Sequence, residues 1–143
     1  MTQPRIYRSE RGARRILARY RTLLDEWPVP ADQRLIPTGL GETFVVSSGP
    51  VGAPPLVLLH GSGTNSAMWR AEVPAFARNF RVHSVDIVGE PGLSAPARPE
   101  LGSPAYADWL DEVLDGLDAQ QVALVGASLD AWFAAGAVHL PAG

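Results

Sequence analysis

The chain has 143 residues, no cysteine and a formal net charge of −3. This length fits one ordinary domain, and the absence of cysteine excludes disulfides and thiolate metal sites. The sequence contains no apolar run of about 18 residues, and its first ten residues lack the apolar core of a signal peptide. We therefore expect a non-exported, cytoplasmic protein without a membrane span.

The first 21 residues are strongly basic, with seven arginines and a single acidic residue, Glu10. Such a segment could bind nucleic acid or an acidic membrane surface. However, apolar residues recur at three- and four-residue spacing from Ile16 to Trp27, which predicts an amphipathic helix from about Ser9 to Glu26. The arginine face also lacks the interleaved aromatic residues of a single-strand binder. We expect a solvated basic face able to pair with the acidic remainder, with neither nucleic acid nor a membrane as partner.

A linker and a hairpin should follow this helix. The prolines of Trp27–Pro30 end the helical periodicity. Arg34–Pro37 and Glu42–Ser47 are short strand candidates that flank two glycines, so they predict a hairpin. Pro55–His60 contains four successive apolar residues, which is typical of a strand covered on both faces, as in a parallel sheet.

The middle of the chain predicts a helix, a strand and a second helix. The first helix runs from about Ala67 to Asn79, and Pro74 inside it should produce a kink or an irregular first half. A strand over Phe80–Ile87 leads into a segment rich in glycine and proline. Ser103 and Pro104 then open the second helix, since serine caps helices and proline is tolerated in the first turn.

The last part contains a strand over Val122–Val125, a turn with a serine, and a helix from about Leu129 to His139. The resulting order of strands and helices predicts an α/β fold, with a mostly parallel sheet and helices on both faces. We divide the chain into residues 1–31, the basic helix and linker, and residues 32–143, the α/β portion.

Three motifs occur in order along this portion. They read L-V-L-L-H-G-S-G at 56–63, V-D-I-V-G-E-P-G-L-S at 85–94, and G-A-S at 126–128. The serine turn alone is weak evidence, but an H-G-x-G loop after an apolar strand upstream makes the combination fairly specific. From the hairpin near Glu42 onward, the chain resembles the N-terminal part of the α/β-hydrolase family, in particular its small carboxylesterase-like bacterial members.

The resemblance implies a serine hydrolase that acts on carboxylic esters or similar acyl substrates, without metal or cofactor. Ser128 matches the nucleophile, and the backbone N–H groups of Ser62 and Leu129 match the oxyanion hole. Fixed donors of this kind each lower the barrier by about 3 kcal/mol, because they face the charge that develops on the carbonyl oxygen. The surrounding site loop comprises His60, Gly61 and Gly63.

Other polar residues near these motifs have plainer interpretations. His60 should shape its loop, and His83, inside a strand, should be structural. Asp86 should organise the glycine-rich segment that follows it, although a role as catalytic acid is the alternative. Glu90 and Ser94 have the same organising interpretation.

The base and the acid of a hydrolase of this type follow the serine in sequence. His139 is the only histidine after Ser128, and on a continuous helix it would lie about 16 Å along the axis from the serine. Asp130 also replaces the usual glycine of the serine turn. We therefore expect the 143-residue chain to be incomplete or inactive alone. The alternative is a non-catalytic binding module or half-domain, and in either case the apolar edge of Val122–Val125 should favour self-association or a partner strand.

Overall fold

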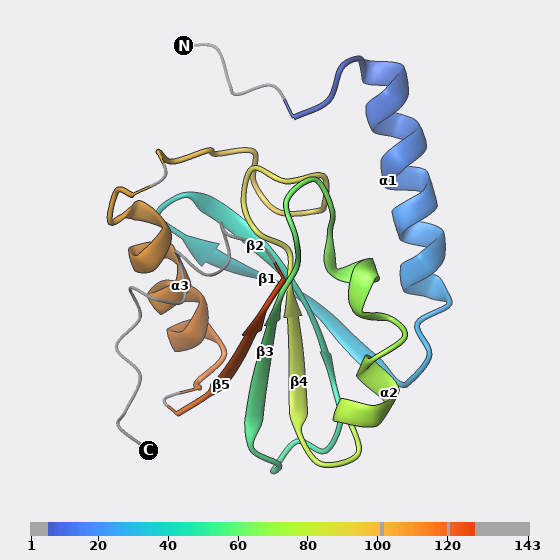
Figure 1. Cartoon of the computed structure of the whole chain (residues 1–143), viewed down its shortest axis with the longest axis vertical. Helices are drawn as coiled ribbons and strands as arrows, with labels where there is room; N and C mark the ends of the chain where they lie inside the picture. Colours follow the sequence, from blue (N-terminus) through green and yellow to red (C-terminus); the bar gives the residue numbers. More distant parts are fainter. Residues whose placement is uncertain (1–5, 101, 120, 128–143) are drawn as a thin grey trace.

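The structure is a computed structural model that describes residues 6–100, 102–119 and 121–127 (Figure 1). The helix expected at Leu129–His139 lies outside these residues, as does Asp130. The elements in chain order are α1 (Glu10–Asp25), β1 (Ala31–Thr38), β2 (Gly41–Ser48), β3 (Pro55–Leu59), the 3-10 helix η1 (Ser66–Trp69), α2 (Val73–Phe76), β4 (Arg81–Val85), α3 (Ala105–Gly116) and β5 (Ala123–Gly126).

The five strands form one sheet in the order β1-β2-β4-β3-β5. The hairpin β1–β2 is antiparallel, as expected, and β2 pairs with β4 in the antiparallel sense. β3 lies between β4 and β5 and is parallel to both, so that Leu59 is opposite Val85 on one side and Gly126 on the other. The predicted α/β class is confirmed, with a parallel centre and an antiparallel hairpin at one side.

Alternating side chains of the strands divide the core into two layers. Val57 and Leu59 face α3 and pack with Trp109 and other buried residues of that helix. Leu56 and Leu58 point to the opposite face and pack against η1 and α2. Figure 1 shows α3 on one side of the sheet and α1 and α2 on the other. Full burial of one such side chain contributes about 1.5–3 kcal/mol to the free energy of folding, so both layers stabilise the sheet.

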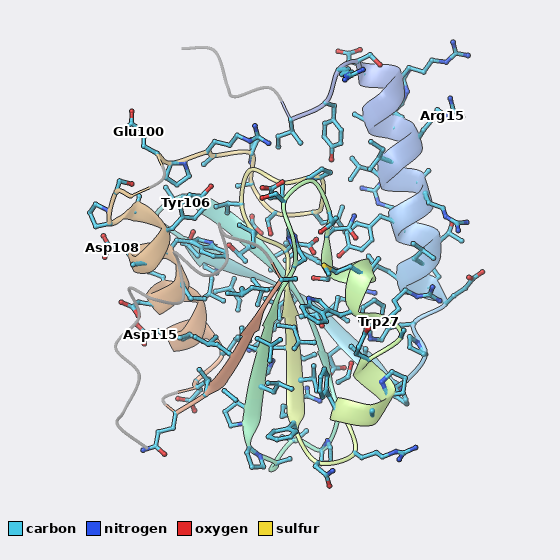
Figure 2. The ribbon with its side chains drawn as sticks, viewed as in Figure 1. Arg15, Trp27, Glu100, Tyr106, Asp108 and Asp115 are labelled. Atoms are coloured by element: carbon cyan, nitrogen blue, oxygen red, sulfur yellow. The ribbon has the colours of Figure 1, made fainter. Side chains whose placement is uncertain are left out.

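The start of α1 follows from its cap. The Ser9 hydroxyl accepts a hydrogen bond from the Gly12 amide at 3.0 Å, which contributes about 1 kcal/mol of helix stability. The arginines of the helix are exposed, as predicted, and Figure 2 shows Arg15 pointing away from the sheet. Ile16, which the spacing of apolar residues places on the buried face, is 43% exposed. The buried face of α1 is therefore narrower than the sequence predicts.

The inner side of α1 packs directly on the sheet. Tyr20 and Leu24 are buried in a cluster with Phe44 and Val46 of β2, and Trp27 of the linker packs against the same cluster. The predicted amphipathic helix is therefore confirmed, and its apolar face covers the hairpin side of the sheet.

The helix expected over residues 67–79 is not continuous. The structure has η1 at Ser66–Trp69 and a separate α2 at Val73–Phe76, with Pro74 in the first turn of α2. Proline lacks the N–H that a first turn leaves unpaired, so Pro74 begins a new helix instead of kinking a long one. The expected irregular first half is present as the 3-10 helix η1, but the prediction of one continuous helix was wrong, because the proline was assigned to a helix interior.

The other layer is anchored by a tryptophan. Trp109 of α3 is 1% exposed, and its indole Nε1 donates to the Thr43 hydroxyl of β2 at 2.7 Å. Asp108 and Asp115 lie on the outer side of the helix (Figure 2). The buried apolar side of α3, which carries Trp109, is therefore the face that packs on the sheet.

Candidate active site

The loop that begins at His60 and the described start of the G-A-S turn meet at the carboxyl ends of β3 and β5. Gly126 pairs with Leu59 in the parallel register, and the Ala127 amide donates to the Leu59 carbonyl at 3.0 Å. The described part of the serine turn therefore lies beside the start of the H-G-S-G loop. Parallel α/β sheets bind their ligands at this edge. Ser128 and Leu129, which follow Ala127 in sequence, lie outside the described residues.

His60 fixes the start of the site loop. Its side chain is fully buried, and its Nε2 accepts a hydrogen bond from the Ile87 amide at 2.9 Å. The ring proton therefore lies on Nδ1, which donates to the Gly61 carbonyl at 2.9 Å. Both ring nitrogens are used to shape the loop, which confirms the interpretation of His60.

The middle of the loop is held from two sides. The Gly63 amide donates to the Glu90 carboxylate at 2.9 Å, and the Gly61 amide contacts the Met68 sulfur at 3.1 Å. Gly63 has a φ of +76°, a left-handed conformation that favours glycine. These contacts set the path of the backbone on both sides of Ser62. The role of the Ser62 amide as an oxyanion donor stays a prediction.

Asp86 holds the end of the same loop. Its carboxylate is fully buried and accepts from the Ser66 amide at 2.9 Å and from the Leu93 amide at 3.0 Å. The Tyr20 hydroxyl lies 2.8 and 2.9 Å from the two carboxylate oxygens. A side chain on Gly92 would lie 2.6 Å from one of these oxygens, so the loop needs glycine there. Asp86 organises the glycine-rich segment, as the sequence predicts.

Ser94 and Glu90 belong to the same network. The Ser94 hydroxyl donates to the Asp86 carbonyl at 2.6 Å and accepts from the Phe44 amide at 2.8 Å. Glu90 is buried and holds Gly63, as described above. Their organising interpretation is confirmed by these contacts.

The role of Tyr20 was missed by the sequence reasoning, which placed it only in the apolar stripe of the helix. Burial is the main cause that raises the pKa of Tyr20, and the charge of Asp86 and the hydrogen bond to it add to the effect. Burial and then the charge of Asp86 also raise the pKa of Tyr7, which precedes α1. A buried tyrosine usually finds a hydrogen-bond partner for its hydroxyl, so a tyrosine within a leucine-rich stripe is the signal that could have revealed this contact.

His83 lies in the middle of β4, where it pairs with Val57 of β3. It borders a cavity of about 340 Å³ that Arg34 and Arg81 also line, near the starts of β3 and β4. Its Nδ1 lies 2.7 Å from the Ser47 hydroxyl. Burial, and then the charges of Arg81 and Arg34, lowers the pKa of His83 to about 4. His83 is thus a buried residue of the sheet, in keeping with the structural role that the sequence predicts.

Within residues 6–100, 102–119 and 121–127, no three histidine, aspartate or glutamate side chains are grouped so that they could hold a metal ion. No helix in those same ranges combines the length and apolar character that a membrane crossing requires.

The family model of the alpha/beta hydrolase fold matches residues 54–129, more than half of the chain. The chain belongs to the α/β-hydrolase family. The resemblance inferred from the three motifs is thereby confirmed. The match includes the site loop, the glycine-rich segment and the serine turn of this α/β-hydrolase.

Relatives of this α/β-hydrolase include carboxylesterases of Bacillus subtilis. The uncharacterized carboxylesterase nap is 38% identical over 110 residues, and carboxylesterase YbfK is 36% identical over 110 residues. Each match covers 77% of this chain and 37% of the relative. The crystal structure of naproxen esterase (carboxylesterase NP) from the same organism superposes with a TM-score of 0.74 at 36% identity, covering 86% of this chain and 43% of that one. The chain therefore spans less than half the length of these relatives.

Proposed function

We propose that this chain provides the nucleophile and the oxyanion donors of a serine hydrolase that cleaves carboxylic esters or similar acyl substrates. The observation that carries the proposal is the pairing of β5 with β3. This pairing brings the start of the G-A-S turn beside the exit of β3 into the H-G-S-G loop. The carboxylesterase names of two relatives support the ester class of substrate.

In the proposed reaction, the Ser128 hydroxyl attacks the ester carbonyl carbon while a base removes the hydroxyl proton. The electron pair of the carbonyl moves to its oxygen, and the amides of Ser62 and Leu129 donate to the oxyanion. The intermediate then expels the alcohol, which takes the proton from the base. Water repeats the sequence on the acyl-enzyme, releasing the acid and restoring the serine. The fixed donors each contribute about 3 kcal/mol of transition-state stabilisation.

The base must come from outside the described residues. The two histidines of the described ranges are His60 and His83. Both ring nitrogens of His60 form hydrogen bonds that shape the loop. His83 lies in the middle of β4, with its Nδ1 2.7 Å from the Ser47 hydroxyl, and it borders the cavity near the starts of β3 and β4. We therefore propose that the 143-residue chain alone hydrolyses esters slowly or not at all, and that turnover needs a histidine and a carboxylate supplied to the site.

The test is hydrolysis of p-nitrophenyl butyrate by the product of the complete reading frame and by the 143-residue chain. In the active form, Ser128→Ala should lower kcat by at least about a thousandfold, because the nucleophile is lost while folding is kept. Ser103→Ala, which removes a serine hydroxyl from the turn before α3, serves as the matched control and should leave kcat unchanged. An undiminished rate in Ser128→Ala, or no ester hydrolysis by either form, would contradict the proposal and favour a binding module.

A further inference from the structure

We propose that Tyr20 is a positioning residue of the active site, and that α1 thereby belongs to the scaffold that holds the oxyanion loop. The inference rests on the proposed serine hydrolase function, because it concerns the loop that carries the Ser62 donor. It gives the N-terminal helix a role beyond covering one side of the sheet.

The first step of the argument is the contact between α1 and the exit of β4. The hydroxyl of Tyr20 lies 2.8 and 2.9 Å from the two carboxylate oxygens of Asp86, which is 66 positions away in sequence. Tyr20 is 2% exposed and Asp86 is fully buried, so bulk water does not replace this donor. The tyrosine ring packs edge-on against Phe44 at 6.4 Å and 81°, which orients the hydroxyl toward Asp86.

The second step is that the same carboxylate holds two loops. One oxygen accepts from the Ser66 amide at the end of the site loop, and the other accepts from the Leu93 amide in the glycine-rich segment. The next residue, Ile87, donates its amide to His60 at the start of the site loop. Two adjacent residues, Asp86 and Ile87, therefore fix both ends of the loop that contains Ser62.

The third step concerns what the hydroxyl does for the carboxylate. A buried carboxylate depends on its hydrogen-bond donors, and within the described part of the chain Tyr20 supplies a side-chain donor beside the backbone amides of Ser66 and Leu93. Without this donor, the carboxylate must rotate or admit a water molecule, and either change alters its bonds to Ser66 and Leu93. Oxyanion donors act only within a few tenths of an ångström of their working position. Loss of the Tyr20 hydroxyl should therefore lower the rate of the chemical step.

The charge of Asp86 extends to the segment ahead of the helix. It contributes, after burial, to the raised pKa of Tyr7. α1 itself reaches the exit of β4, where the two loops are tied, through the Tyr20 hydroxyl. Figure 1 shows these loops and the start of α1 at the same end of the sheet.

The experiment compares Tyr20→Phe with Leu24→Ala in the product of the complete reading frame. Tyr20→Phe keeps the ring and removes only the hydroxyl. We expect kcat for p-nitrophenyl butyrate to fall about tenfold while KM stays within about twofold, since a small displacement affects the transition state more than ground-state binding. Hydrogen exchange should become faster at the amides of Ser66 and Leu93.

Leu24→Ala is the matched control. Leu24 is 5% exposed and packs α1 against the cluster that contains Tyr20 and Phe44. Its apolar side chain has no group that could donate a hydrogen bond to the Asp86 carboxylate. This variant weakens the docking of α1 and retains the tyrosine hydroxyl. At a temperature where circular dichroism shows both variants to be folded, Leu24→Ala should keep kcat and the exchange rates of Ser66 and Leu93 near those of the wild type.

Two results would overturn the inference. One is a Tyr20→Phe variant with unchanged kcat and unchanged exchange at Ser66 and Leu93. The other is an equal loss in Leu24→Ala, because the helix would then act only through its docking. If the wild-type protein shows no hydrolysis that depends on Ser128, the proposed function fails instead. The exchange comparison would still decide whether the Tyr20 hydroxyl holds the loop.

Discussion

At the scale of single residues, several polar side chains of the site hold the backbone of the surrounding loops, although their residue types can also serve in catalysis. His60, Asp86 and Ser94 are residue types that also serve as base, acid and nucleophile in hydrolases. Each of them is buried or half-buried, and each forms hydrogen bonds with backbone groups that set the path of the surrounding loops. Residue type therefore does not identify a catalytic role, whereas the partner of each polar atom does.

The pKa of His83 predicts a specific dependence of stability on pH. The pKa of His83 is about 4 in the folded protein, whereas the ordinary value of 6.5 applies in the unfolded chain. Between these two pH values the unfolded chain therefore binds more protons than the folded protein. The free energy of unfolding should thus fall as the pH falls from about 6.5 toward 4. Each pKa unit corresponds to about 1.4 kcal/mol, and partial solvent access to the ring reduces the expected loss to about 1–2 kcal/mol.

Urea unfolding at several pH values measures this effect. His83→Asn cannot take up a proton, so its stability should change less than that of the wild type over the same range. The arginines beside the ring, Arg34 and Arg81, are unchanged in the variant, as is Asp32, which pairs with Arg81 at 3.2 Å. If the free energy of unfolding changed equally with pH in the two proteins, His83 would not titrate as described.

The residue contacts also show what sequence could and could not predict. The spacing of apolar residues predicted the buried face of α1, and the motifs predicted that His60 and Asp86 organise loops. The bond between Tyr20 and Asp86 joins residues 66 positions apart, and no local pattern carries that information. The role of Tyr20 became visible only when the packing of α1 on the sheet was known.

At the scale of elements, periodicity predicted strands well and short helices poorly. The uninterrupted apolar run of β3 indicated a strand covered on both faces, and both faces are covered. η1 and α2 have four residues each, too few for the spacing of apolar residues to predict a helix. The pairing of β2 with β4 joins segments that are distant in sequence, so it depends on tertiary packing. Local sequence therefore predicted which elements form but left the order of strands in the sheet open.

The outer edge of β5 carries a prediction for the 143-residue chain. In the described part of the sheet, β5 is the last strand and pairs on one side with β3, while Leu124 and Val125 are only half-buried. Unpaired backbone groups beside apolar side chains favour pairing with another chain. We expect this chain to associate as its concentration rises, as measured by light scattering after size exclusion. A monomer with cooperative thermal unfolding at all concentrations would contradict the expectation.

At the scale of the whole molecule, two layers of helices hold a sheet whose carboxyl edge carries the candidate site. α3 packs on one face and α1, η1 and α2 on the other (Figure 1). The exits of β3, β4 and β5 converge on this edge, and the exit of β4 ties the loop of β3 to the N-terminal helix. The fold thus places the loop that contains Ser62 beside the start of the serine turn, and the proposed base belongs to residues outside the described part.

The most direct test of the central claim is covalent labelling with a fluorophosphonate, a reagent that phosphonylates activated serines, followed by peptide mass spectrometry. The account predicts that the product of the complete reading frame gains one adduct, on the peptide that contains Ser128, and that Ser128→Ala gains none. An adduct on another residue, or no adduct on a protein that hydrolyses esters, would contradict the assignment of Ser128 as the nucleophile.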